Sequence, residues 1–212
     1  MTTTKQTTNQ TQSGPFAPPA DPREALFSAV DQAVAVVGLL RPDRLAGPTP
    51  CAEYDVRHLT GHLVAVLRRI GYVAGGGHAY DVPSIVLDLP DDGWLTAAEA
   101  NAAGLRSAWA DGAVLDRVLR LPCGEVPGRV AALAYVQELT THAWDLATAL
   151  GRADVLDPAL AELALVAAQR FLPAEPRGGP VPFGPPLPVA ADAPVYDRLV
   201  AWLGRDPQWS VA

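Results

Sequence analysis

Apolar segments with helical spacing, separated by glycine- and proline-rich breaks, run through most of this chain. Typical helix-starting residues stand before them, with Asp21 and Pro22 ahead of the first segment and Asp55 ahead of the second. Glycines that can end a helix follow, as in the run at 75–77 and at Gly151. Alternating apolar and polar residues, which would predict strands, are scarce. The pattern therefore predicts an all-α protein built as an antiparallel helical bundle.

Five helices and a shorter closing helix are expected from these boundaries. They cover about residues 22–40, 55–74, 95–111, 128–150, 158–172 and 195–203. The stretch "LPCGEVPG", residues 121–128, is interpreted as an extended turn because proline and glycine recur in it. With 212 residues, of which 49% are hydrophobic and 18% charged, the chain can bury one sizeable core. One domain with extensions is expected.

The two ends of the chain differ in composition from the helical region, 21–172. Residues 1–20 are polar and rich in threonine and glutamine, which predicts a disordered leader. Residues 173–212 hold the closing helix and a proline-rich strap, which cannot form a helix or sheet of its own. Apolar side chains are predicted to dock this region on the bundle: Phe183, Leu187, Val189, Val195, Leu199, Val200 and Leu203. The strap is either a structural brace over the core or one wall of a ligand cavity.

Charge and cysteine content argue against several classes of function. A formal net charge of -7 and a pI near 5.0 predict repulsion from phosphate backbones and anionic lipids, so nucleic acid is not an expected partner. No apolar run approaches the roughly 18 residues that span a membrane, and the first residues lack the apolar centre of a signal peptide. Two cysteines, Cys51 and Cys123, are too few for a disulfide framework. A cytoplasmic protein is expected.

The stretch "AYVQELTTHAWDLATALG", residues 134–151, combines three ionisable side chains with an apolar helix face. At about 100° per residue, the apolar side chains share one arc, and Glu138, His142 and Asp145 fall in a narrow band on the other side. Glu138 and His142 are either a solvated pair worth about 0.2 to 0.5 kcal/mol or two ligands of one metal ion. Asp145 is placed to accept the second N–H of His142, to cap, or to face solvent. This segment alone offers no third ligand.

The second predicted helix offers a candidate for that third ligand. His62 lies at the margin of its apolar face, bracketed by Leu59 and Leu63. It is either a core histidine with a satisfied ring nitrogen or a metal ligand. His58 and Arg69 lie further toward the solvent side. Arg69 then either contacts an anionic substrate or extends along the surface with its charge in water.

Two separated motifs resemble those of a known superfamily. "TPCAEYDVRHLTGHLV" (49–64) is similar to a "TPC-x-x-W-x-V-x-x-L-x-x-H" opening, with Tyr54 in place of the usual tryptophan. "ELTTHAWDLATALG" (138–151) is similar to an "E-x-x-x-H-x-WDLA-x-A-x-G" segment. Both patterns are typical of the DinB-like, mycothiol-dependent maleylpyruvate isomerase superfamily. The proline-rich strap and the closing "WLGRDPQW" (202–209) add a similarity to an actinobacterial metal-binding family within it, so the resemblance spans about residues 22–207.

The resemblance implies a four-helix bundle with one divalent metal ion. Carried over to this sequence, the ligands would be His62, Glu138 and His142. Zinc is the first expectation, and nickel, iron or manganese also suit two imidazoles and a carboxylate. Three protein ligands would leave a coordination position for the sulfur of mycothiol, and a coordinated thiol loses its proton.

The function implied by the resemblance is that of a thiol-dependent S-transferase or isomerase acting on a small electrophile. The alternative is a non-catalytic protein that binds a metal or a small ligand. Arg69 and Tyr135 are the candidate substrate contacts, and no catalytic residue is assigned. The isomerase proper has a larger C-terminal domain, so its substrate cannot be carried over. A monomer or a homodimer is expected.

The two cysteines and His58 have open roles. Cys51 precedes a helix N-terminus, where a thiol has a lowered pKa, so it is either a nucleophile or a residue packed under the loop. Cys123 is interpreted as a turn residue without a chemical role. His58 is either incidental or tunes the metal site.

Overall fold

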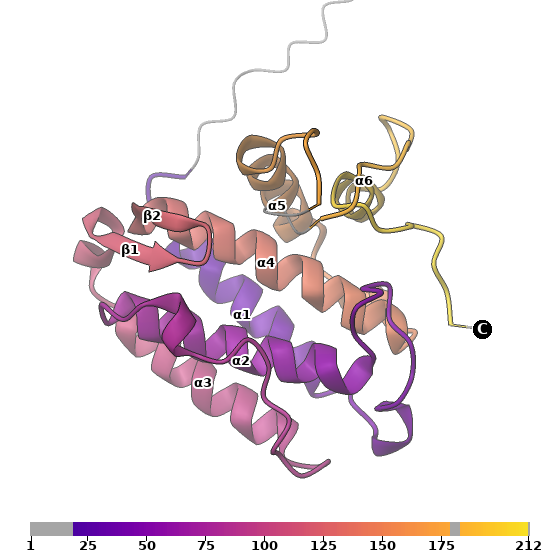
Figure 1. Cartoon of the computed structure of the whole chain (residues 1–212), viewed down its shortest axis with the longest axis horizontal. Helices are drawn as coiled ribbons and strands as arrows, with labels where there is room; N and C mark the ends of the chain where they lie inside the picture. Colours follow the sequence, from indigo (N-terminus) through magenta and orange to yellow (C-terminus); the bar gives the residue numbers. More distant parts are fainter. Residues whose placement is uncertain (1–18, 179–182, 212) are drawn as a thin grey trace, which may run out of the picture.

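A computed structural model describes residues 19–178 and 183–211 of the chain. Four long helices form a bundle, and two further helices pack beside its α4 member (Figure 1). Their bounds are α1 Arg23–Val37, α2 Val56–Ala74, α3 Trp94–Trp109, α4 Gly128–Ala149, α5 Pro158–Phe171 and α6 Val195–Trp202. The all-α bundle predicted from the sequence is confirmed. Of the leader predicted at 1–20, residues 1–18 lie outside the described part.

Helix direction within the bundle follows from side chains that bridge neighbouring helices. The Asn101 amide donates to the carbonyl of Val64 and the Trp109 indole to that of Ile70, so α2 and α3 run parallel. Arg106 donates to the carbonyl of Phe27, and α1 and α3 run antiparallel. Two consecutive parallel helices need a connection that returns along the bundle, and residues 75–93 provide it.

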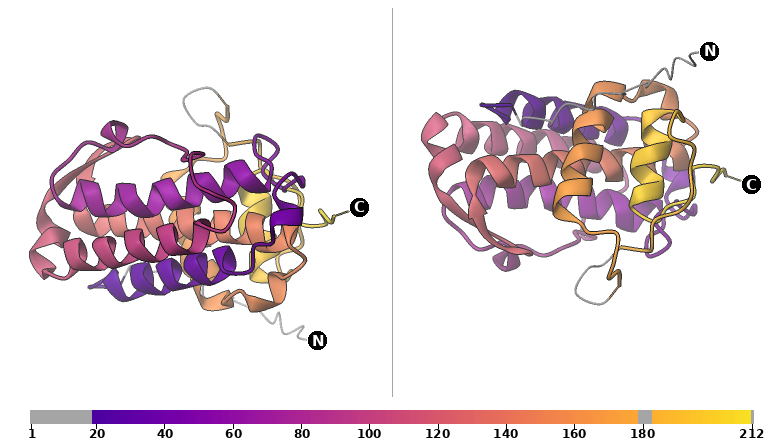
Figure 2. Two further views of the ribbon diagram at one scale, coloured as in Figure 1. Left: turned by 90° about the horizontal axis from the view of Figure 1, so that it is seen from below. Right: turned by 90° about the horizontal axis from the view of Figure 1, so that it is seen from above.

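α4 is the most enclosed helix of the bundle. It contacts α1 and α2 on one side and α5 on the other, and Figure 2 shows α5 and α6 side by side across it. The apolar arc predicted for it is confirmed as core, with Leu150 only half-buried: Val136, Leu139, Ala143, Leu146 and Ala147 are fully buried. The opposite face is buried as well, so the polar band lies between helices and not on a solvated surface.

The capping residues predicted for α2 and α4 are confirmed, and the one predicted for α1 is not. The Asp55 carboxylate accepts the backbone N–H of His58 at 2.8 Å, which makes it the N-cap of α2 as expected. Gly151 has a φ of 68° just after α4, in the left-handed region that favours glycine. The prediction for α1 is wrong by one residue: the helix begins at Arg23 with Pro22 in the N-cap position, so Asp21 is not its N-cap.

The prediction of an extended turn at 121–128 is wrong, because this region belongs to a β-hairpin. β1 (Val118–Leu121) pairs antiparallel with β2 (Gly124–Pro127), Leu121 opposite Gly124. Gly124 has a φ of 121°, which closes the tight turn. Leu119 and Leu121 are buried against the bundle, and this packing stabilises strands of only four residues.

The strap docks differently from the prediction. Leu187 and Val189 stay 37% and 39% exposed, and only Phe183 packs partly against the core. Their exposure has a simple cause: the strap lies along α6, where the Leu187 N–H donates to the carbonyl of Ala201 at 2.9 Å. In the closing helix region the expectation is confirmed, since Leu199, Val200 and Leu203 are buried and Val195 is partly buried.

Among the described residues, no helix has the length and hydropathy needed to cross a bilayer.

A substitution at Gly61 tests how closely the return connection, residues 75–93, packs on α2. A Cβ at this position would lie 2.1 Å from the Val86 carbonyl oxygen, and the Val86 N–H donates to the Gly61 carbonyl. Gly61→Ala is therefore expected to lower the free energy of unfolding by about 1–3 kcal/mol, measured by urea denaturation. Gly104→Ala is the matched control, since a Cβ there meets nothing within 4 Å. It should stabilise α3 by about 0.5–1 kcal/mol, and equal losses for the two variants would contradict the account.

Candidate metal centre

Three of the predicted side chains converge between α2 and α4. His62 projects from α2, while Glu138 and His142 project from successive turns of α4. Glu138 Oε1 lies 3.2 Å from Nε2 of His62 and 3.8 Å from Nε2 of His142. The imidazole rings meet edge to face, with centroids 4.8 Å apart. One donor atom from each residue lies within 4.8 Å of the other two, so all three can reach a single ion.

The second nitrogen of each imidazole is engaged elsewhere. Nδ1 of His62 lies 2.8 Å from the carbonyl oxygen of Ser84, and Nδ1 of His142 lies 3.0 Å from Asp145 Oδ2. A carbonyl oxygen only accepts, so Nδ1 of His62 carries the proton. In the neutral ring, Nε2 then presents a lone pair to the Glu138 carboxylate. Two acceptors face each other unless a proton or a cation lies between them, and this donor set fits a divalent metal ion.

Mutual electrostatics keep Glu138 ionised. Burial raises the pKa of its carboxyl, but the hydrogen bond with His62 and the proximity of both histidines outweigh burial and lower the pKa to about 2. Burial lowers the pKa of His62, and the Glu138 carboxylate more than reverses this effect. The Glu138 side chain is 29% exposed and the two imidazoles are about 10% exposed, so the cluster can be reached from one side.

Asp145 joins the cluster to the C-terminal segment. Its carboxylate has no exposed surface, so the alternative that Asp145 faces solvent is wrong. Besides His142, it accepts from Nε and Nη2 of Arg205, with Arg205 Nε 2.7 Å from Oδ1. Arg205 follows α6 and belongs to the "LGRDP" segment. Sequence reasoning missed Arg205 as part of the site, although the "GRDP" motif (204–207) was available as a signal.

Comparison with known proteins gives the family. The mycothiol maleylpyruvate isomerase N-terminal domain family matches residues 26–147, which span more than half of the chain and include all three convergent side chains. The chain belongs to this family. Two uncharacterized proteins of Mycobacterium tuberculosis, one from strain CDC 1551 and one from strain H37Rv, are each 35% identical over 185 residues. The match covers 87% of this chain and 98% of each relative.

One solved structure supports the same fold. The crystal structure of the mycothiol-dependent maleylpyruvate isomerase is similar to the structure of this chain, with a TM-score of 0.51 and 17% sequence identity. The similarity covers 69% of this chain and 67% of that one. At this identity the likeness establishes a shared architecture. It therefore confirms the DinB-like bundle expected from the two sequence motifs.

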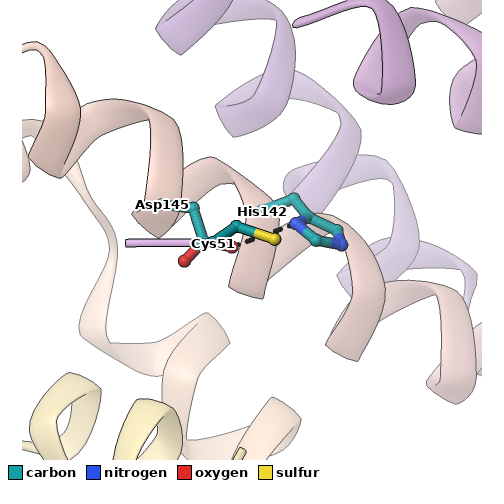
Figure 3. A group of neighbouring side chains, drawn as sticks. All are labelled: Cys51, His142 and Asp145. Carbon is teal, nitrogen blue, oxygen red and sulfur yellow. Dashed lines mark hydrogen bonds and ion pairs between the residues drawn. The ribbon is translucent and has the colours of Figure 1, made fainter. Parts of the chain in front are cut away.

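Cys51 lies beside His142, one of the three convergent side chains. Figure 3 shows its sulfur next to the His142 ring, with Asp145 behind, and donor atoms of these three residues also lie within 4.8 Å of one another. Burial and the Asp145 charge raise the pKa of the Cys51 thiol to about 11, so it is protonated at neutral pH. This pKa argues against the nucleophile interpretation and agrees with packing under the loop. Cys123 is exposed in the hairpin turn.

The remaining predicted residues are placed as follows. Nδ1 of His58 lies 2.7 Å from the Asp55 carboxylate at the α2 N-terminus, with the imidazole 42% exposed. Arg69 is only 8% exposed, so the interpretation that its charge extends into water is wrong; its Nη2 instead donates to the carbonyls of Val82 and Pro83. Tyr135, one turn before Glu138, is 5% exposed.

The buried ion pair predicts a large effect at Arg205. Arg205→Ala would leave the Asp145 carboxylate buried without its cation, and the free energy of unfolding should fall by about 3–5 kcal/mol in chemical denaturation. Arg198→Ala is the control from the same segment. Arg198 pairs with Glu162, whose side chain is 59% exposed, and its loss should cost less than about 1 kcal/mol.

The stability difference between wild type and Arg205→Ala should depend on pH if the ion pair with Asp145 causes it. Burial raises the pKa of Asp145, but Arg205 and the His142 hydrogen bond outweigh burial and hold it below its usual value. A lowered folded-state pKa stabilises the fold above the unfolded value of about 3.9, and this contribution is lost as pH falls toward the folded-state pKa. Without Arg205, burial raises the Asp145 pKa in the variant. The difference between wild type and Arg205→Ala should therefore be largest near neutral pH and shrink as pH falls from the variant's raised pKa toward the lowered wild-type pKa. A difference independent of pH would contradict the ion-pair explanation.

Proposed function

We propose that this protein is a metal-dependent enzyme that uses a low-molecular-weight thiol of the mycothiol class, as an S-transferase or an isomerase. His62, Glu138 and His142 would hold one divalent cation. The observation that supports the proposal is the position of the two Nε2 atoms and the Glu138 carboxylate, which face one another while both Nδ1 atoms are engaged elsewhere.

The protein's own residues would fix the site before any ligand arrives. Asp145 and the Ser84 carbonyl hold the two imidazoles by Nδ1, which orients each Nε2 toward the shared point. Glu138 contributes one negative charge. A divalent cation held this way would lower the pKa of a thiol in its open coordination position and supply a thiolate at neutral pH. Zinc fits this donor set best among common ions, and nickel, iron or manganese would also be accommodated.

The family and the structural neighbour support the choice of thiol. Both carry mycothiol and maleylpyruvate isomerase in their descriptions, which names a thiol cosubstrate and an isomerisation for those proteins. For this chain we propose the same cosubstrate class together with a small electrophilic substrate. The specific electrophile is a matter for experiment.

The metal is the first test of the proposal. Protein stripped by a chelator and then dialysed against zinc should bind about one equivalent, measured by elemental analysis. His142→Ala should reduce this to background, because one of three donors is lost. His58→Ala is the matched control, since its imidazole pairs with Asp55 at the helix end, and it should keep the full equivalent. Full zinc occupancy in His142→Ala would overturn the ligand assignment.

The thiol is the second test. In calorimetry, mycothiol should bind the zinc-loaded protein and bind the stripped protein at least about 10-fold more weakly, because the thiolate loses its cation. Turnover of an electrophile panel should depend on both zinc and thiol. Zinc binding without thiol binding or turnover would instead establish a non-catalytic metal-binding protein.

A further inference from the structure

Arg69 is a buried cation without an acidic partner. Its side chain lies inside the protein, and among the described residues no carboxylate forms an ion pair with it. Nη2 donates to two carbonyl oxygens of the return connection, while Nε has no partner. Burying a guanidinium is unfavourable unless an anion compensates the charge. Arg69 therefore lacks the negative group that its position calls for.

Tyr135 is a second buried donor without a partner in the described part of the chain. Its hydroxyl makes no hydrogen bond, although only 5% of the residue's surface is exposed. Burial raises the pKa of this hydroxyl, so it stays protonated and able to donate at neutral pH. Other buried donors also have no partner, such as Trp94 Nε1, Trp202 Nε1 and Nη1 of Arg177, whose guanidinium lies over the Trp202 ring. Arg177 is only partly buried, whereas Arg69 is buried.

Helix geometry directs the two side chains toward each other, between α2 and α4. α2 and α4 run antiparallel. His62 meets Glu138 near the middle of α4. The carbonyl of Ala74 at the α2 C-terminus instead accepts from Arg117, whose own carbonyl accepts the N–H of Gly128 at the α4 N-terminus. Helical side chains lean toward the N-terminus of their own helix. Arg69, about 10 Å beyond His62 along α2, thus leans back toward it, and Tyr135 leans from Glu138 toward the level of Arg69. The Arg69 charge accordingly acts on both groups: it opposes the burial that raises the pKa of Tyr135, and it adds to the burial that lowers the pKa of His62.

We propose that Arg69 and Tyr135 form an anion subsite beside the triad, which binds a carboxylate group of the substrate. Nε of Arg69 would donate to one carboxylate oxygen and the Tyr135 hydroxyl to the other. One positive charge and one neutral donor match a monoanionic carboxylate better than a phosphate dianion. The inference rests on the proposed function and deepens it: it specifies an electrophile with a carboxylate held beside the His62–Glu138 pair.

Succinate and its uncharged diamide are suitable probes, used with metal-free protein so that no cation can bind the carboxylate. In calorimetry, wild type should bind succinate at least about 10-fold more tightly than the diamide. Arg69→Met should remove this preference, and Tyr135→Phe, which deletes only the hydroxyl, should weaken succinate binding about 5-fold. Arg68→Met is the control, because it changes the net charge equally at an exposed neighbouring position.

Several outcomes would overturn the subsite. These are no succinate binding by folded wild type, equal losses for the Arg68 and Arg69 variants, or an unchanged affinity in Tyr135→Phe. If Arg69→Met fails to fold, Tyr135→Phe still decides. The test is separate from that of the proposed function, because zinc content is measured on the same variants. Succinate binding through Arg69 without any zinc site would sustain the subsite and refute the metal-dependent enzyme, and zinc binding without carboxylate preference would do the reverse.

Discussion

The carboxylate of Asp145 is fully buried, and the rest of the site depends on how its charge is compensated. Arg205 compensates it from a segment 60 positions later in the chain, through hydrogen bonds from Nε and Nη2. Asp145 is then free to accept from Nδ1 of His142 on its own helix. One ion pair thus ties the C-terminal segment to α4 and fixes the ring whose other nitrogen faces Glu138. The C-terminal region reaches the candidate centre through Arg205, and its proline-rich strap lies along α6.

The return connection has the corresponding role on the α2 side. Parallel α2 and α3 require a long segment between them, and this segment passes so close to α2 that Gly61 leaves no room for a Cβ. The close approach places the Ser84 carbonyl against His62. The same segment offers two carbonyls to Arg69, which leaves one edge of that guanidinium unused. The topology of the bundle therefore orients one imidazole and places a cation near it.

Local signals in the sequence were sufficient for most of the fold. Asp55 and Gly151 mark helix ends through caps that act within a few residues, so these boundaries could be predicted. The hairpin could not, because its strands have four residues and depend on burial of Leu119 and Leu121 by distant helices. Exposure of Leu187 and Val189 has a similar origin: apolar character predicts docking, but the hydrogen bond to α6 decides the path of the strap.

The candidate site, like the fold, could be predicted from the sequence only in part. Spacing placed Glu138 and His142 side by side, and the resemblance added His62 from another helix, which the structure brings to the same point. Arg205 and the Ser84 carbonyl could not be found this way, since each acts on a histidine more than 20 residues distant. The burial of Arg69 was equally hidden, because it depends on the connection that covers it.

X-ray absorption at the zinc edge of the metal-loaded protein, without added thiol, tests the central claim most directly. Two overlapping donor groups share His142, one with His62 and Glu138 and the other with Cys51 and Asp145. The account predicts only nitrogen and oxygen donors at about 2.0–2.2 Å, with the outer-shell scattering of two imidazoles. A sulfur donor at about 2.3 Å that disappears in Cys51→Ser, or scattering from a single imidazole, would contradict it.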